Sequence, residues 1–599
     1  MNEASTQDGT YPRPQLVRGS HLALDVMAGF AYDDGNVGLR ENWHERADVF
    51  DRLIQLPFAP ESPASGIGDT AHHPVVWYRI SFDDDDLAAA GRHRQGDRVL
   101  LHFGAVDHSA DVWVNGIHVV HHEGGQTPFS ADITEALAGT NHHVAIVRAE
   151  DDPLDATMPR GKQDWMAEPH VIWYHRQTGI WRTVWLEAVP ELHIVDIDWE
   201  CNATRDTVRL DVTLSRRPVE PVDIDVRLSF AGSQLVRHRF SAGAVRSSVS
   251  IPLPSQANAQ DAGRLEWSPA QPHLVDAVIA LHSTVSADTV ASYLGIRSIG
   301  IADGRFLLND RPTYIRSVLE QGYWPTSHYT PPSMAAIRSE VELMLALGFN
   351  AVRIHQKVED PRFLYWCDRL GLMVWGETAN AYEFGPTAIR RLTTEWPAII
   401  DRDRSHPSIV TWVPLNESWG AQHGAHDAAQ RAYGLALANL TRAMDPSRPV
   451  ISNDGWEHTD SDLWTIHDYE ADGDVLRSRY GDRGAIDEMI GGMGPAGRRM
   501  SLLPVEDFGK PVMLTEFGGV SYDPSAKPDD SWGYSVAADA GDFARRLTAI
   551  LEAVNGSRHL AGFCYTQLTD TRQETNGLCD EDRRPKLDLA TLAALIRGE

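Results

Sequence analysis

The last 295 or so residues of the chain alternate between short apolar strands and amphipathic helices, and this alternation restricts the fold more than any other feature. The segment 333–347 predicts a helix with Ile337, Val341, Met344 and Leu345 on one face. Eight strands separated by helices are what a (β/α)₈ barrel requires, whereas a doubly wound sheet would not naturally supply eight. The candidate strands span 314–319, 350–355, 372–377, 409–416, 449–453, 463–467, 511–516 and 561–567.

Two regions of β-type sequence precede the alternating part. From Pro57 to about Glu187, runs such as ADVWVNGIHV (110–119) lie between turn residues, and the VNGI turn predicts a hairpin. From about Pro190 to Gly300, runs such as TVRLDVTL (207–214) alternate with period two and contain no cysteine pair to bridge two sheets. We therefore predict a multidomain β plus α/β chain: an N-terminal jelly-roll β-sandwich (1–189), an immunoglobulin-like β-sandwich (190–302) and a C-terminal (β/α)₈ TIM barrel (303–599).

Composition excludes several classes of partner. Lys and Arg total 54 against 84 Asp and Glu, a formal charge of −30, so neither nucleic acid nor an anionic membrane is an expected partner. The start of the sequence lacks a secretion signal and no stretch approaches about 18 apolar residues, so a soluble, cytoplasmic protein is expected. The four cysteines lack CxxC spacing, which favours free thiols over a zinc site or disulfides. We expect no cofactor and no required metal, and homo-oligomerisation stays open.

Glutamates end two of the apolar runs, and the carboxyl ends of strands are where function gathers in such barrels. Asn416 and Glu417 follow the fourth strand in IVTWVPLNE, and Glu516 ends the seventh in PVMLTE. Strands four and seven face each other across a barrel mouth, which can bring two carboxylates to the separation of about 5 to 5.5 Å found in retaining glycosidases. One carboxylate then attacks the anomeric carbon, while the other protonates the leaving oxygen and later activates water. Each glutamate alone is a common feature, but the pair predicts this chemistry.

Three residues at other strand ends are expected to support the pair. Arg353 ends the second strand and can hold Glu516 ionised through a charge-assisted hydrogen bond. Tyr469 follows the sixth strand and either places its hydroxyl against the same carboxylate or only braces its loop. Asn416 is a candidate for the 2-hydroxyl of a sugar, a contact that strengthens in the transition state.

Further polar and aromatic residues after the strands are candidates for contact with sugar hydroxyls or rings, because Trp offers a flat apolar face with a donor at its edge. Spacing does not separate such residues from core residues. The substrate-binding candidates are His355, His467, Glu377, Asn453, Trp324 and Trp532, with Gln356, Lys357, Trp419, Asp454 and Asp468 as further strand-end residues.

A set of motifs along nearly the whole chain resembles glycoside hydrolase family 2, the family of β-galactosidases, β-glucuronidases and β-mannosidases. The resemblance implies a sugar-binding-like jelly roll, an immunoglobulin-like domain and a catalytic barrel. It also implies that Glu417 is the acid/base, Glu516 the nucleophile and Arg353 its partner. The segments that carry it are VDHSADVWVNGIHVVHHEGGQTPFSADIT (106–134), RQTGIWRTVWLE (176–187), GFNAVRIHQ (348–356), WCDRLGLMVWGE (366–377), VPLNESWG (413–420), LTEFGG (514–519) and GFCYTQLTDTRQETNGLCDEDRRPK (562–586).

Departures from the family pattern bear on the sugar. The motif that meets the carboxylate of glucuronides, Asn-x-Lys, corresponds here to the stretch 574–577, which offers Glu574 and no Lys. An unpaired buried carboxylate would cost several kcal/mol, which disfavours a β-glucuronide. The resemblance thus implies an exo-acting retaining hydrolase of neutral glycosides, with β-galactosides ahead of galactofuranosides, arabinofuranosides and mannosides; an oligosaccharide or small glycoside is the expected substrate.

Other classes stay open. A carbohydrate-binding protein that has lost turnover would keep the fold, although the retained glutamates argue against it. An aldolase would need a Schiff-base lysine at a strand end, where Lys357 is the candidate. His72, His73 and the segment 160–163 are candidates for a jelly-roll loop at the barrel mouth, but surface or interdomain packing is the favoured interpretation.

Overall fold

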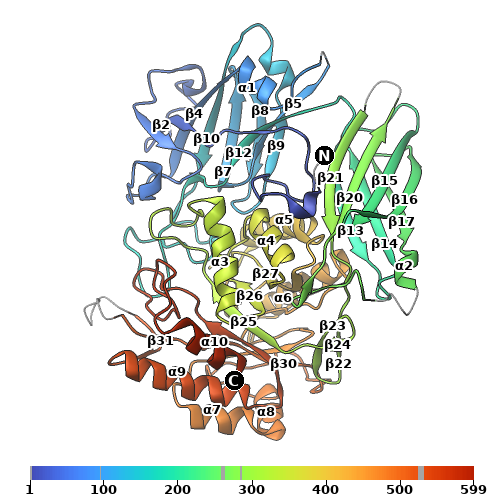
Figure 1. The fold of residues 1–599 in the computed structure, drawn as a ribbon. Coiled ribbons are helices and arrows are strands. Elements are labelled where there is room, and N and C mark those ends of the chain that lie inside the picture. Colours follow the sequence, from blue (N-terminus) through green and yellow to red (C-terminus); the bar gives the residue numbers. More distant parts are fainter. Residues whose placement is uncertain (1–2, 95, 258–262, 284–286, 524–531) are drawn as a thin grey trace.

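The computed structural model describes residues 3–94, 96–257, 263–283, 287–523 and 532–599. Two β-sandwiches lie beside a barrel of strands and helices (Figure 1). This architecture confirms the predicted multidomain β plus α/β class. None of the helices in the described part of the chain combines the length and the apolar character needed to span a bilayer.

The first sandwich consists of a six-stranded and a four-stranded antiparallel sheet whose facing side chains form one hydrophobic cluster. The predicted VNGI hairpin is confirmed, because Val114 pairs with Ile117 and the turn residues Asn115 and Gly116 have positive φ angles. The strand order of the six-stranded sheet is β3 (Arg52–Gln55), β2 (Met27–Tyr32), β4 (Val75–Asp83), β10 (His142–Glu150), β7 (Ser109–Val114), β8 (Ile117–Glu123). The strand order of the four-stranded sheet is β1 (Leu22–Ala23), β12 (Val184–Val189), β5 (Arg98–Phe103), β9 (Phe129–Asp132).

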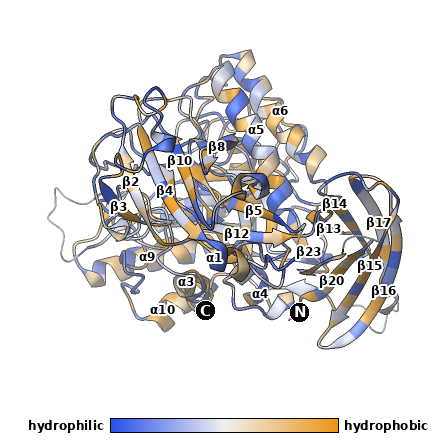
Figure 2. Ribbon diagram, turned by 90° about the horizontal axis from the view of Figure 1, so that it is seen from above, coloured by the Kyte–Doolittle hydropathy of each residue, from blue (hydrophilic) through white to orange (hydrophobic). Residues whose placement is uncertain are grey.

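The second sandwich packs a three-stranded sheet on a four-stranded one around a separate hydrophobic cluster. Buried and exposed residues alternate along β14, as its period-two sequence predicts, and Figure 2 shows hydrophobic and hydrophilic residues interleaved in this region. The strand order of the three-stranded sheet is β13 (Ile194–Cys201), β14 (Thr207–Leu214), β17 (Arg246–Pro252). The strand order of the four-stranded sheet is β16 (Ser233–Ala242), β15 (Val222–Phe230), β20 (Val275–His282), β21 (Ala287–Leu294). A small sheet of β22 (Ile299–Ala302), β23 (Arg305–Leu308) and β24 (Arg311–Pro312) leads into the barrel.

The barrel contains seven parallel strands within one sheet, surrounded by helices. Helix α3 begins where the Ser333 side chain accepts from the Ala336 N–H, and it buries Ile337, Val341 and Met344 against the strands. The strand order is β28 (Ile409–Val413), β27 (Met373–Glu377), β26 (Ala351–Ile354), β25 (Ile315–Glu320), β33 (Leu560–Thr566), β30 (Val512–Gly518), β29 (Trp464–Asp468). The helices are α3 (Met334–Ala346), α4 (Pro361–Leu370), α5 (Pro386–Asp403), α6 (Ala428–Met444), α7 (Gly473–Tyr480), α8 (Arg483–Ile490), α9 (Ala540–Asn555) and α10 (Leu589–Arg597).

The predicted fifth strand, 449–453, is wrong as a regular strand. One isolated bridge, between Trp412 and Val450, joins this segment to β28, and a second bridge joins Asn416 to Asp454 just beyond both. On its other side, the Val450 N–H donates to the side chain of Asp462, and the Ser452 N–H to that of Ser461. Side chains therefore take the donors that a neighbouring strand would otherwise bind.

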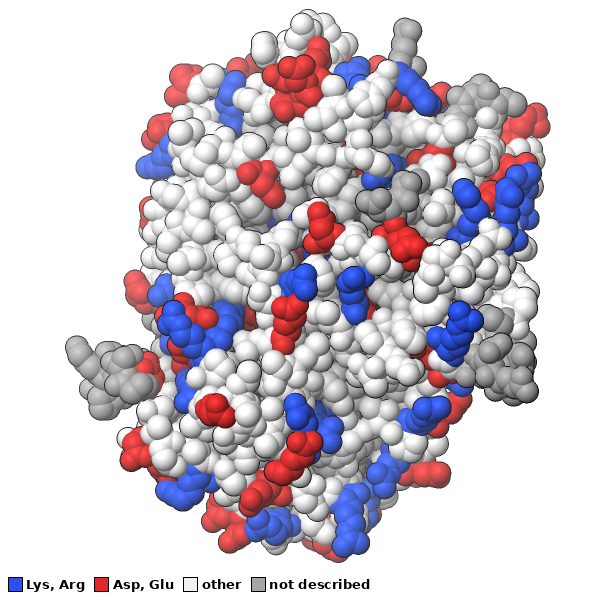
Figure 3. Space-filling model, viewed as in Figure 1, with Lys and Arg blue, Asp and Glu red and all other residues white. Residues whose placement is uncertain are grey.

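Acidic and basic side chains are interspersed over the face drawn in Figure 3, without a broad patch of either sign. This face thus carries mixed charge, in the manner of a solvated protein surface.

Candidate active site

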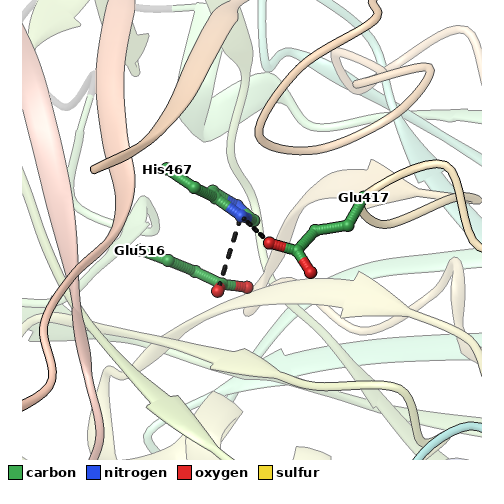
Figure 4. A group of neighbouring side chains, drawn as sticks. All are labelled: Glu417, His467 and Glu516. Atoms are coloured by element: carbon green, nitrogen blue, oxygen red, sulfur yellow. Dashed lines mark hydrogen bonds and ion pairs between the residues drawn. The ribbon is translucent and has the colours of Figure 1, made fainter. Parts of the chain in front are cut away.

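Glu417 and Glu516 come together at the carboxyl ends of the barrel strands. Glu516 lies within β30, and Glu417 follows β28 on a turn where it and Ser418 both have positive φ angles, 51° and 60°. One carboxylate oxygen of each glutamate and one ring nitrogen of His467 all lie within 4.8 Å of one another (Figure 4). The Glu417 side chain is 19% exposed, whereas that of Glu516 is 6% exposed. Both carboxylates therefore face the same small volume, and Glu417 is the more accessible.

Arg353 is fully buried and contacts five side chains, those of Glu516, Asp454, Glu377, Asn416 and His355. Its Nη1 donates to Glu516 Oε1 at 3.0 Å and lies 2.5 Å from Asp454 Oδ2. Its Nε donates to Glu377 Oε2 at 2.8 Å, and its Nη2 to Asn416 Oδ1 at 2.7 Å. These charge-assisted bonds fix the orientation of Glu516 and leave the Asn416 amide nitrogen without a partner among the described residues. The expected contact between Arg353 and Glu516 is present.

Tyr469 binds the second oxygen of Glu516. Its hydroxyl donates to Glu516 Oε2 at 2.6 Å, and its ring stacks on Tyr534 with centroids 3.3 Å apart. Trp532 packs edge-on against Tyr534 at 4.8 Å, so it supports the tyrosine pair. Burial and the charge of Glu516 raise the pKa of Tyr469 well above its usual value, so the phenol keeps its proton and can donate.

His467, from β29, lies between the two glutamates. Its Nδ1 is 2.8 Å from Glu417 Oε1 and 3.4 Å from Glu516 Oε2, and its Nε2 is 2.9 Å from Asp454 Oδ2 (Figure 4). Burial lowers the pKa of His467, but the negative charges of Glu516 and Asp454 and its hydrogen bonds outweigh this effect and raise the pKa to about 10. The ring is therefore an imidazolium that donates from both nitrogens.

The imidazolium determines the charge of Glu417 in turn. Burial alone would raise the pKa of Glu417, but the hydrogen bond and charge of His467, followed by the charges of Lys162 and Arg353, lower it. In the free protein at neutral pH the proton shared by this pair therefore resides on His467.

The remaining predicted residues lie at different distances from the glutamates. The Nδ1 of His355 lies 3.1 Å from Glu377 Oε1. The same oxygen accepts from the Gln356 N–H, and the other oxygen of Glu377 accepts from Arg353. The side-chain oxygen of Asn453 accepts from the Ser418 N–H, and its amide nitrogen donates to the Ser418 hydroxyl. Asn453 therefore stabilises the turn that carries Glu417.

Trp324 lies in another environment. The Arg583 guanidinium is 3.5 Å from the centroid of its ring, and Trp324 lines a small cavity with His175, His328 and Arg572. Within the described part of the chain, Trp324 makes no hydrogen bond or ring contact with Glu417 or Glu516.

A loop of the first sandwich, residues 151–178, reaches the barrel mouth. The Gly161 N–H donates to the Asn380 carbonyl at 3.1 Å, and the Tyr382 hydroxyl donates to the Gly161 carbonyl. Gly161 has φ of +58°, and a Cβ there would lie 2.2 Å from the Gln356 carbonyl oxygen, so only glycine fits. The segment 160–163 thus packs between the two domains, as favoured from the sequence, and it does so at the barrel face that carries the glutamates. His72 is exposed and His73 pairs with Asp34, so these two do not contribute.

Two contacts of this loop involve residues that strand-end reasoning did not select. The Lys162 ammonium lies 5.1 Å from the ring centroid of Trp419, two residues after Glu417. The Tyr174 hydroxyl donates to Glu574 Oε2. The contact between Gly161 and the barrel depends on residues far apart in the sequence, and no local sequence pattern indicates it. The sequence alone could therefore not have paired these segments.

Glu417, His467 and Glu516 have the residue types and spacing of a metal site. Both nitrogens of His467 are however engaged with carboxylates, and its pKa of about 10 means that they carry protons rather than free lone pairs. The arrangement suits proton transfer between acids better than coordination of a cation.

Comparison with known proteins gives the same picture over most of the chain. Residues 23–190 match the model described as "Glycosyl hydrolases family 2, sugar binding domain", and residues 299–520 match "Glycosyl hydrolases family 2, TIM barrel domain". A β-galactosidase of Thermoanaerobacter pseudethanolicus is 27% identical over 415 residues, 66% of this chain and 51% of that enzyme. The β-glucuronidase of Mus musculus is 27% identical over 475 residues, 72% of this chain and 68% of that enzyme. The matched regions thus span about half to two thirds of these relatives.

Solved structures share the fold along the whole chain. A β-galacturonidase from Eisenbergiella tayi, bound to galacturonate, has a TM-score of 0.70 and 19% identity, with 98% of each chain covered. A β-glucuronidase from Ruminococcus gnavus has a TM-score of 0.73 and 17% identity, covering 98% of this chain and 99% of that one. At such identities the structures establish only the fold. Together with the two family models, these matches show that the chain belongs to glycoside hydrolase family 2.

Proposed function

We propose that the protein is an exo-acting retaining glycosidase that hydrolyses a terminal sugar by double displacement. Glu516 attacks the anomeric carbon, and Glu417 protonates the departing glycosidic oxygen. Water, deprotonated by Glu417, then attacks the anomeric carbon of the glycosyl-enzyme and releases the sugar with its original configuration. The observation that carries the proposal is the approach of these two carboxylates to within 4.8 Å, close to the roughly 5 Å spacing of retaining enzymes.

Their different surroundings support the division of roles. Glu516 accepts hydrogen bonds on both oxygens, from Arg353 and Tyr469, which orients its carboxylate for attack. Glu417 is more exposed and shares its proton with His467, so it has a partner for proton transfer. Because that proton resides on His467 in the free protein, its transfer from Nδ1 to Oε1 must precede or accompany protonation of the leaving oxygen.

For the sugar itself, we propose a neutral glycone with β-galactosides as first candidates, and galactofuranosides, arabinofuranosides or mannosides as alternatives. Glu574 is buried in the stretch that, by resemblance, corresponds to the Asn-x-Lys motif of the glucuronidases, where a uronate would need a positive group. Its carboxylate accepts from Tyr174 and Asn576, and burial raises its pKa. The relatives include enzymes named for galactosides, glucuronides and galacturonides, so the choice rests on this carboxylate.

The mechanism is tested with the variants Glu516→Ala and Glu417→Ala on 4-nitrophenyl glycosides. Each should lose at least about 10³ in kcat, because neither step is bypassed cheaply. Azide should restore turnover of the Glu417 variant and give a glycosyl azide of retained configuration. The control is Glu342→Ala, an exposed glutamate of α3, which should behave as wild type. An inverted first product from the wild-type protein would exclude double displacement.

A carbohydrate-binding protein without turnover is the remaining class. A panel of aryl α- and β-pyranosides and furanosides distinguishes it. Tight oligosaccharide binding by calorimetry, with no hydrolysis of any member of the panel, would replace the enzymatic proposal.

A further inference from the structure

Lys162 is the cation of the site that the proposed mechanism does not use. It comes from the loop of the first sandwich, and only 7% of its surface is exposed. Its Nζ lies over the ring of Trp419 at 5.1 Å. No carboxylate or other acceptor among the described residues lies within hydrogen-bonding distance of Nζ, whereas Arg353 and His467 each bind two or more acidic side chains.

The position of Lys162 is fixed by its neighbours in the chain. Gly161 seats the turn against the barrel, as described above, and leaves no room for a different backbone path. The Lys162 carbonyl accepts from the Tyr174 N–H at 2.9 Å, and the Tyr174 hydroxyl donates to Glu574. Lys162 and Glu574 are therefore held by one rigid connection, yet they form no ion pair with each other.

The electrostatic influence of Lys162 extends to both sides of the site. Against the effect of burial, its charge lowers the pKa of Glu574, and after His467 it also contributes to the low pKa of Glu417. Burial and Arg353 lower the pKa of His355 most, and Lys162 lowers it further. The charge of the ammonium thus acts on Glu417, Glu574 and His355 together.

Among the described residues the Lys162 ammonium has no acceptor, and the Glu574 carboxylate, linked to the same loop through Tyr174, does not pair with it. We propose that Lys162 and Glu574 bind neighbouring hydroxyls of a neutral glycone, Lys162 as donor to one oxygen and Glu574 as acceptor from the other hydroxyl. This inference rests on the proposed glycosidase function and deepens it, because it makes the first sandwich a source of sugar specificity.

The charges of the site favour a hydroxyl pair over a sugar carboxylate. Among the described residues, the carboxylates of Glu377, Glu417, Asp454, Glu516 and Glu574 face three cationic groups, those of Lys162, Arg353 and His467. A uronate would add a further negative charge close to Glu574, which costs free energy in a buried site. A hydroxyl instead satisfies the donor and the acceptor without adding charge.

The experiment compares wild type, Lys162→Met, Glu574→Gln and the control Lys510→Met. Lys510 is half-buried, donates to the Ser461 carbonyl and stacks near Trp464, so its variant loses a comparable lysine outside the site. The substrates are the 4-nitrophenyl glycoside that wild type hydrolyses best, its singly deoxygenated analogues, and the matching uronide. Each kcat/KM is measured at the pH optimum of the variant, because the charge of Lys162 also lowers the pKa of Glu417.

Lys162→Met should reduce kcat/KM on the parent glycoside about 10- to 100-fold, the usual effect of a hydrogen bond to a charged group. On the analogue that lacks the hydroxyl bound by Lys162, the ratio of wild type to variant should fall to near one. For Glu574→Gln, the ratio of wild type to variant should fall to near one on the analogue that lacks the neighbouring hydroxyl. Lys510→Met should match wild type on every substrate.

Three results overturn the inference while leaving the glycosidase proposal intact. They are an unaffected Lys162→Met, a loss that is equal on every analogue, or a uronide that wild type prefers and that the variant specifically loses. Failure of wild type to hydrolyse any glycoside would instead refute the proposed function.

Discussion

Replacement of His467 by glutamine removes the positive charge between the two glutamates while keeping a hydrogen-bonding side chain. The pKa of His467 is about 10 in the folded protein against an ordinary 6.5, which corresponds to about 5 kcal/mol of favourable interaction with its carboxylates. The side chain is 1% exposed, so solvent screens little of this interaction.

The sign of the pH dependence follows from the raised pKa. The stabilisation is fully present below pH 6.5, where the unfolded chain is also protonated, and it is lost as pH rises toward 10. Within this window the difference between wild type and His467→Gln should shrink as pH rises, by about 2 to 3 kcal/mol between pH 7 and pH 9. For a barrel of this size that is about 4 °C in the difference between the melting temperatures.

Differential scanning calorimetry of the barrel transition at four pH values between 6.5 and 9.5 measures this difference. His458→Gln is the matched control, because burial lowers the pKa of His458 to about 4 and the ring is neutral throughout this range. Its difference from wild type should be flat above about pH 7.5, where His458 is neutral in the folded and the unfolded chain alike. If the His467→Gln difference were equally flat, His467 would be neutral in the folded protein, and the assignment of the shared proton would be refuted.

Two substitutions test other contacts of the site. Tyr469→Phe removes the hydroxyl that donates to Glu516 at 2.6 Å, so kcat should fall about 10- to 100-fold while the melting temperature changes little; an unchanged kcat would make Tyr469 a loop brace only. Gly161→Ala places a Cβ 2.2 Å from the Gln356 carbonyl oxygen, so the loop must shift and kcat/KM should fall at least about tenfold through displaced Lys162. Steady-state kinetics with wild-type activity for Gly161→Ala would show that the loop position is not critical.

The sequence predicted those parts of the fold that depend on local periodicity. Period-two runs formed the sandwiches, and the face of Ile337, Val341 and Met344 formed a helix packed on strands. The irregular conformation of the segment 449–453 could not be predicted in the same way, because its apolar residues are those of a regular strand. Whether a ladder forms there depends on Ser461 and Asp462, whose side chains bind its backbone donors.

The candidate site divides along the same line. Glu417, Glu516, Arg353 and Tyr469 follow or end strands, so the geometry of a parallel barrel brings them together from sequence order alone. Lys162 is brought to them by contacts between two domains, and no period or spacing within either segment encodes that meeting. His467 was placed correctly at a strand end, but its charge depends on three carboxylates from separate strands and loops.

The hydrogen bond from Tyr174 to Glu574 joins residues 400 positions apart. Translation at about 5 to 20 residues per second separates their synthesis by about 20 to 80 s. The first sandwich can fold during that time, but its loop 151–178 lacks its contacts with Gln356 and Asn380 until those residues are made, and its contact with Glu574 until almost the whole chain is made. Nascent chains should therefore be cleaved by proteases within this loop and become resistant there only near completion, which makes the loop a reporter of finished biosynthesis.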